Sequence, residues 1–192
     1  TQLDSGALAW GDADSDGDLD LLVSGKDATG TPKTMIHYNT LGSFSTATAI
    51  GTAVWSSSVA WADYDNDGDQ DFAISGATAT SEITEIWKNN NGTFAKLTTT
   101  ALGLSLSSLA WADYDNDGDL DLFIAGKRTV TYYTRIYRND AGTFTEQDLG
   151  FPGVQNASLA MGDYNNDGFV DLLLTGEYSD GSTTTNISRI YR

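Results

Sequence analysis

The sequence of 192 residues contains no cysteine, one histidine, two prolines and only four glutamates. The absence of cysteine excludes a disulfide scaffold, a thiolate zinc site and a cysteine nucleophile. The formal charge is −17, and a surface this acidic argues against nucleic acid as a partner because it repels phosphate. No apolar run approaches the roughly 18 residues of a membrane-spanning helix, so membrane insertion is not expected.

The chain is instead rich in aspartate, and most of it falls in four clusters that start 51, 50 and 50 residues apart. Short apolar segments recur with the same period on both sides of each cluster. In the second copy these segments are Ser58–Trp61, Phe72–Gly76, Ile86–Asn89 and Gly92–Phe94. The sequence is therefore an internal repeat with a period near 50 residues.

Each repeat is predicted to form four short strands, because its segments are rich in β-branched and aromatic residues and end at Gly, Asn or Asp. No window shows a capped helical period. The predicted fold class is all-β, a β-propeller of four-stranded antiparallel blades with four blades in this chain. The repeats are assigned to residues 7–57, 58–107, 108–157 and 158–192, with residues 1–6 as a fourth strand of the last blade.

Three arrangements of the ring are open at this point. Residues 1–4 pair with the strand at Ile187–Tyr191 and close a four-bladed ring, or the chain is part of a longer propeller, or it is half of an eight-bladed dimer. An unclosed ring would expose strand edges and favour self-association.

The aspartate clusters have the spacing of a cation-binding loop. Oxygen-bearing side chains occupy positions 1, 3, 5 and 9 of each cluster, and position 6 is Gly17, Gly68, Gly118 or Gly168. Short side chains at alternate positions of a tight loop converge, and Gly allows the positive φ that turns the chain. Carboxylates this close repel one another unless a hard cation lies between them. The flexible oxygen coordination of Ca²⁺ suits such a loop, so about four Ca²⁺ ions are predicted, one per repeat.

The predicted side-chain ligands are Asp12, Asp14, Asp16, Asp20, Asp63, Asp65, Asp67, Asp71, Asp113, Asp115, Asp117, Asp121, Asp163, Asn165, Asp167 and Asp171. Position 7 is predicted to bind through its backbone carbonyl, which explains why it holds Asp18, Asp69 and Asp119 but also Phe169. The loops are not EF-hands, because position 12 is apolar where an EF-hand needs a bidentate Glu; position 9 is expected to supply that contact. Polar turns without metal are the alternative interpretation. The fourth loop, with Asn165, should bind most weakly.

The Asp-x-Asp-x-Asp-Gly-x-x-Asp loop between two strands, followed by Gly-x-Phe, resembles the FG-GAP/VCBS repeat of integrin-α-type β-propellers. The sequence of residues Trp111–Asp121 is particularly similar to VCBS arrays of large secreted bacterial surface proteins. This resemblance implies structural Ca²⁺ and a role in adhesion, ligand display or spacing. Integrin-type propellers have seven blades, whereas four are visible here, and no ligand site can be transferred.

The recurring Trp10, Trp61 and Trp111 are interpreted as packing between blades, with sugar-stacking platforms as the alternative. Trp55, Trp87 and the pair Tyr132–Tyr133 lie outside that phase and are expected in loops. No base, nucleophile and orienting group recur together, so no catalytic residue and no cofactor other than the ion are predicted.

Three classes of function follow from these observations. The preferred one is a calcium-stabilised extracellular binding or cell-adhesion module that recognises a protein or glycan partner. The alternatives are a structural spacer in a large surface protein and, less favoured, a polysaccharide-acting lyase or hydrolase. Loops of this type suit the millimolar Ca²⁺ outside cells, which predicts an extracellular location, on the surface of or secreted from a bacterial cell.

Overall fold

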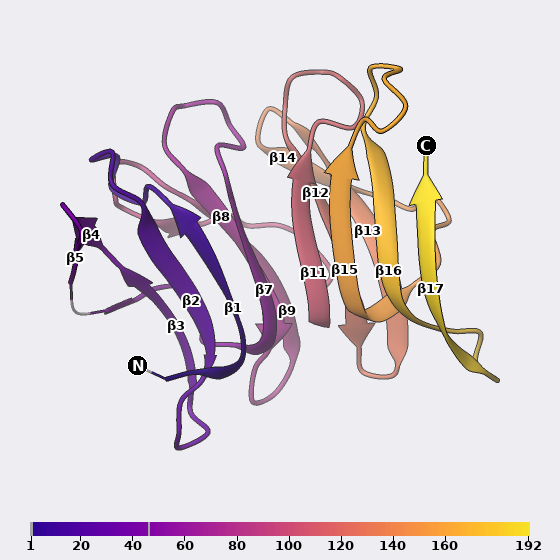
Figure 1. Ribbon diagram of the computed structural model, residues 1–192, viewed down its shortest axis with the longest axis horizontal. Coiled ribbons are helices and arrows are strands. Elements are labelled where there is room, and N and C mark those ends of the chain that lie inside the picture. Colours follow the sequence, from indigo (N-terminus) through magenta and orange to yellow (C-terminus); the bar gives the residue numbers. More distant parts are fainter. Residues whose placement is uncertain (1, 46) are drawn as a thin grey trace.

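The computed structural model describes residues 2–45 and 47–192, and in these residues all regular structure is β. Four units follow the sequence repeat, and each is a meander of antiparallel strands (Figure 1). Repeat 1 contains β1 (Asp4–Gly11), β2 (Asp20–Lys26), β3 (Pro32–His37), β4 (Asn39–Thr40), β5 (Ser43–Phe44) and β6 (Thr48–Ala49). Repeat 2 contains β7 (Trp55–Ala62), β8 (Asp71–Ala77), β9 (Glu82–Lys88) and β10 (Ala95–Lys96).

Repeat 3 contains β11 (Ser105–Ala112), β12 (Asp121–Arg128), β13 (Thr131–Asp140) and β14 (Thr143–Gln147), and repeat 4 contains β15 (Val154–Gly162), β16 (Asp171–Ser179) and β17 (Thr184–Tyr191). A single pairing of Tyr133 with Val154 joins the sheets of repeats 3 and 4. The prediction of an all-β fold with antiparallel sheets is confirmed.

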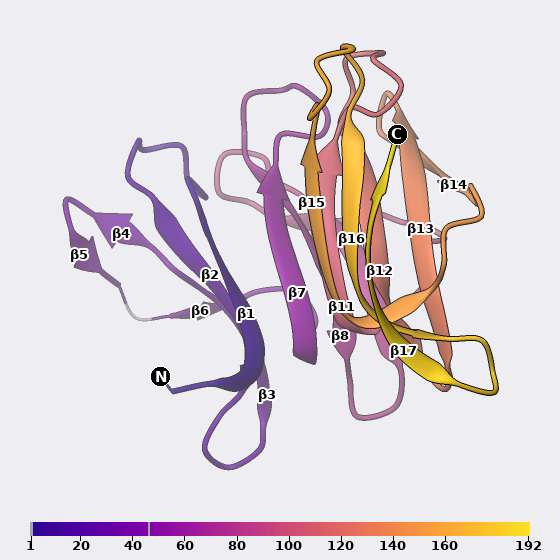
Figure 2. The same cartoon turned by 45° about the vertical axis from the view of Figure 1, so that its right-hand side comes forward.

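The first strands of the repeats, β1, β7, β11 and β15, lie next to one another in sequence order, as the two views show (Figures 1 and 2). Each of them has a bulge within two residues of its start, where a residue with positive φ interrupts the register. These bulge residues are Ser5, Ser56, Leu106 and Asn156, with φ of 47° to 50°. The other end of each first strand leads directly into an aspartate cluster, so all four clusters gather at one side of the molecule.

Apolar clusters fill the junctions between successive repeats. Leu22, Ile36 and Phe72 are fully buried between repeats 1 and 2, and Ile86 and Leu122 between repeats 2 and 3. Trp61 and Trp111 pack against these clusters, which agrees with a packing role. Burial of two sheet faces at each junction is what makes neighbouring repeats depend on each other for stability.

Of the three arrangements left open by the sequence, closure of a four-bladed ring by the N-terminal segment is not found among the described residues. Thr1 lies outside the described residues, Gln2 and Leu3 belong to no strand, and Asp4 to Gly6 are part of β1, which pairs with β2. Within the described residues, β17 pairs only with β16. The first and last repeats lie at opposite ends of the molecule (Figure 1), so the N-terminal segment cannot reach β17.

The expectation of loops around the unphased aromatic residues was also wrong. Trp55 begins β7, Trp87 lies in β9, and Tyr132 and Tyr133 lie in β13. Trp87 stacks on Phe72 with ring centroids 6.0 Å apart and an interplanar angle of 5°. Trp55, Tyr132 and Tyr133 lie in strand ends that extend beyond the recurring apolar segments, whereas Trp87 lies inside the recurring segment Ile86–Asn89.

Candidate metal centre

Each aspartate cluster forms the loop between the first and second strands of its repeat, and glycine is required there for its backbone conformation. Gly17, Gly68, Gly118 and Gly168 have φ of 90° to 96°, while a Cβ at any of them would meet no atom within 4 Å. The conformation therefore demands glycine although space is available. The residue at position 4 of each loop also has a positive φ, in the left-handed region of the backbone. Asn66 and Asn116 adopt this conformation more readily than most residues.

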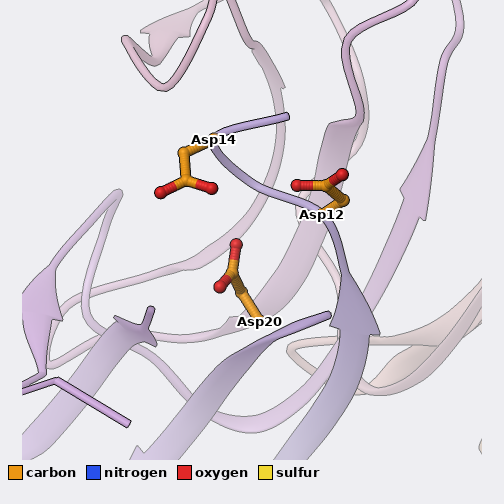
Figure 3. A group of neighbouring side chains, drawn as sticks. All are labelled: Asp12, Asp14 and Asp20. Carbon is orange, nitrogen blue, oxygen red and sulfur yellow. The ribbon is translucent and has the colours of Figure 1, made fainter. Parts of the chain in front are cut away.

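In three loops the carboxylates of positions 1, 3 and 9 converge, with their oxygen atoms within 4.8 Å of one another. Figure 3 shows this for the first loop, where the carboxylates of Asp12, Asp14 and Asp20 face a common space. The other groups are Asp63, Asp65, Asp71 and Asp113, Asp115, Asp121. Three such groups could each hold a metal ion.

The loop backbone fixes the carboxylate of position 1. In the second loop, Asp63 accepts hydrogen bonds from the N–H groups of Asp67 and Gly68, at 3.0 and 2.9 Å. The same pair of bonds occurs in the other three loops. Position 5 also helps to close the turn, because Asp67 accepts from the N–H of Asp69 at 3.0 Å. Position 5 is not among the converging groups, although the sequence placed it with the ligands.

Position 9 is the buried side of the site. Both oxygens of the fully buried Asp71 accept backbone hydrogen bonds, from Tyr64 at 3.2 Å and from Asn89 at 2.7 Å. Burial raises the pKa of Asp71 to about 7, and that of its counterpart Asp121 to about 6. Each oxygen keeps one lone pair after accepting its N–H bond, so these carboxylates can still serve a cation.

The side chains of position 7 are not among the converging carboxylates. Asp69 accepts from Ser15 Oγ at 2.8 Å, a residue of the preceding repeat, and from the N–H of Asn91 at 2.9 Å. Asp119 likewise accepts from the N–H of Ala141. These bonds anchor the turn after the third strand, which gives the position-7 side chain a role separate from ion binding.

The chemistry of the second and third loops fits a hard cation. Asp65 Oδ1 and Asp115 Oδ1 are buried and have no hydrogen-bond partner. A buried carboxylate oxygen without a partner is costly, and so is the mutual repulsion of three carboxylates. A divalent cation held by Asp63, Asp65 and Asp71, or by their counterparts in the third loop, would remove both costs. Such all-oxygen sets are the preferred ligands of Ca²⁺.

In the fourth loop, the grouping of three converging carboxylates does not recur among the described residues. Asn165 takes position 3, and its Oδ1 accepts from the N–H of Asp167 at 2.8 Å. Asp171 keeps its bond to the N–H of Tyr164 at 3.0 Å. The frame of the loop is thus intact, but it has one carboxylate fewer.

The basic and amide side chains at these sites were not predicted from the sequence. Lys88 forms ion pairs with Asp65 and with Asp67, the latter at 3.0 Å, and Arg138 lies 3.9 Å from Asp115. Asn89 Nδ2 donates to the carbonyl of Ala13 in the preceding repeat at 3.0 Å, as Asn139 does to Tyr64 at 2.8 Å. These basic and amide residues recur in the Ile-x-Lys/Arg-Asn segment of the second and third repeats, and this recurrence is the sequence feature that could have indicated their role.

Lys88 is expected to compete with calcium for the second loop. Replacing it in the Lys88→Met variant should raise calcium affinity at this loop roughly tenfold at low salt, because a nearby positive charge opposes a divalent ion. The same variant should be less stable than the parent in EDTA. Calorimetric titration measures the affinity, with Lys33→Met as a matched control because Lys33 pairs with Asp27 outside the loops. Equal affinities in the two variants would contradict this role.

The metal-free chain is expected to lose stability as the pH rises from about 4 to about 7. Asp71 and Asp121 have folded pKa values of about 7 and about 6, raised from an unfolded value of 3.8. The folded chain therefore holds more protons in this range, and its stability falls as the pH rises. Thermal melts in EDTA across the range test this expectation. A melting temperature that rises with pH in EDTA would show that burial does not govern these carboxylates.

The fold and the loops define a class: an all-β repeat protein with an acidic, oxygen-lined loop after the first strand of each repeat. The family model described as FG-GAP-like repeat matches residues 12–74, 76–124 and 113–174. The chain belongs to this family, as its loop motif predicted. No curated protein matches the chain. In the part of the chain that the structure describes, no helix is long and apolar enough to cross a membrane.

Proposed function

We propose that the chain is a calcium-stabilised binding module, built as a β-propeller or a part of one, that recognises a protein or glycan outside the cell. The observation that carries the calcium part is the pair of buried, partnerless oxygens of Asp65 and Asp115 inside converging carboxylate groups. Sites of this type are matched to millimolar calcium, which supports an extracellular location. Membership of the FG-GAP-like family agrees with both points.

The side of the molecule opposite the loops is the proposed binding surface. The bulges of the four first strands surround a hollow of about 320 Å³ lined by Ser56, Ser57, Ser107, Asn156 and neighbouring residues. Its lining contains hydroxyl and amide groups and no charged side chain. Such groups suit the hydroxyl groups of a neutral glycan or the backbone of a protein loop.

Binding to immobilised neutral glycans and matrix proteins, in calcium and after chelation, tests the proposal. Wild-type protein should bind in calcium, and the Asn156→Arg variant should lose binding. The Ala95→Arg variant should retain it, because Ala95 is exposed in β10, at the edge of its sheet farthest from the first strand β7. No binding to any surface would favour the structural spacer. Turnover of a polysaccharide substrate would instead favour the enzyme. Calcium counts from calorimetry test the metal separately.

A further inference from the structure

The junctions inside the chain repeat the same contacts. Trp61 Nε1 donates to the carbonyl of Ala9 in the preceding repeat at 3.3 Å, and Trp111 Nε1 donates to Ala60 at 3.2 Å. The N–H of Leu109 donates to Ser58 Oγ at 3.1 Å. At the next junction, Leu159 and Ser108 form the same bond at 3.1 Å. Each repeat therefore has a donor face toward the preceding repeat and an acceptor face toward the following one.

The donor face of repeat 1 is complete but uncovered. It consists of Leu8, Trp10 and Phe44, with Leu8 66% and Trp10 53% exposed. Trp10 and Phe44 have ring centroids 6.0 Å apart, as Trp111 and Phe144 do in the junction between repeats 2 and 3. The uncovered face thus already holds its two rings at the separation found in an occupied one, so little conformational entropy would be lost on binding.

The acceptor face of repeat 4 is uncovered at the other end of the molecule (Figure 1). Ile190 is 56% exposed, whereas its counterpart Ile136 in repeat 3 is 2% exposed. A hollow of about 270 Å³ on this face is lined by Ala160, Met161, Tyr164, Leu173, Ile190 and neighbouring residues. Ser158 and Ala160, which correspond to the acceptors Ser58 and Ala60, are also exposed here.

We propose that these two faces join head to tail between copies of this chain, with repeat 4 of one copy against repeat 1 of the next. The junction would continue the three present within the chain, with Trp10 Nε1 donating to the carbonyl of Ala160 and the N–H of Leu8 donating to Ser158 Oγ. A second copy is the occupant because each face is complementary to the other and both are carried by one chain. Exposed apolar faces of this kind mark interaction sites.

Calcium should favour this association, because the acidic loops of neighbouring repeats already touch. Asn66 Nδ2 lies 3.3 Å from both the carbonyl of Gly118 and Asp119 Oδ1 in the next loop. Asn116 donates to the carbonyl of Gly168 at 2.9 Å in the same way. A head-to-tail junction brings the fourth loop of one copy beside the first loop of the next, where bound cations reduce the repulsion.

Sedimentation or light scattering in millimolar calcium tests the proposal. Wild-type protein should have at least twice the mass of one 20.5 kDa chain. Trp10→Glu lacks the donor face and Ile190→Glu lacks the acceptor face, so each alone should be monomeric. An equimolar mixture of the two retains one intact junction and should form pairs that neither variant forms alone. Val130→Glu, a change in an exposed turn outside both faces, should leave the wild-type mass unchanged.

Both variants alter exposed side chains, and their thermal melts in calcium should match that of the parent. A wild-type chain that stays monomeric at high concentration in calcium would overturn the proposal. Association that persists in Trp10→Glu or Ile190→Glu, or a mixture that fails to pair, would place the contact elsewhere. Monomeric chains that bind only a different protein through the Trp10 face would also overturn it.

Discussion

Millimolar calcium is expected to raise the free energy of unfolding of this chain more than any single substitution lowers it. Extracellular sites with a Kd of about 10⁻⁴ M each add about 2.7 kcal/mol at 10 mM calcium, because the ion binds only the folded loop. Three converging groups would together add about 8 kcal/mol on that basis. Thermal or denaturant unfolding in EDTA and in calcium measures the difference.

The same experiment has an internal control. Asp65→Asn removes one converging carboxylate whose oxygen is buried without a partner, and it should reduce the bound calcium by one ion. Asp4→Asn removes an equal charge from an exposed position of β1 and should leave the ion count unchanged. Magnesium should stabilise the chain less, since it demands a tighter octahedral geometry. Equal melting temperatures with and without calcium would show that the clusters are polar turns.

Loss of the position-9 carboxylate is expected to be the most damaging single change. In calcium, Asp71→Ala would leave the buried N–H groups of Tyr64 and Asn89 without their acceptors, at about 1–3 kcal/mol for each. It would also remove a predicted ligand of the second loop. We expect a loss of about 4 kcal/mol from the two N–H groups and about 2.7 kcal/mol more from the lost ion, measured by denaturant unfolding in calcium.

Asp69→Ala is the matched control for this change, because Asp69 lies in the same loop but is not part of the converging group. It should cost about 1 kcal/mol, the value of exposed hydrogen bonds, and leave the calcium count intact. Should Asp71→Ala fail to fold, Asp71→Asn keeps one oxygen acceptor and reports the loss of the ion in a folded chain. An Asp71→Ala chain as stable as the parent in calcium would contradict the role of position 9.

The local features of this protein were predictable from its sequence. The aspartates at alternate positions and Gly68 at the turn specify the loop within nine residues, and the strands around it are short and rich in β-branched residues. Both depend on neighbours in the chain, and the repeat gave four independent copies of the same evidence. The family was identified from the same loop, and the family model confirms it.

Contacts between distant segments could not be predicted in the same way. Lys88 approaches Asp65 across 23 residues, and Asn89 reaches the carbonyl of Ala13 across 76. The first contact depends on where the end of β9 lies beside the loop of its own repeat, and the second on how one sheet packs against the next; the residue types of a single strand specify neither.

The sequence by itself determined the repeat, the β-strands and the acidic loops, because these arise from local spacing and backbone conformation. Only the tertiary structure decided that positions 1, 3 and 9 converge while position 5 closes the turn, since this depends on how β2 and its counterparts begin beside the loop. It also decided that the first and last repeats do not meet. A junction forms only where two sheets pack against each other. Within the described residues, the faces at Trp10 and Ile190 have no second sheet against them, so they remain uncovered.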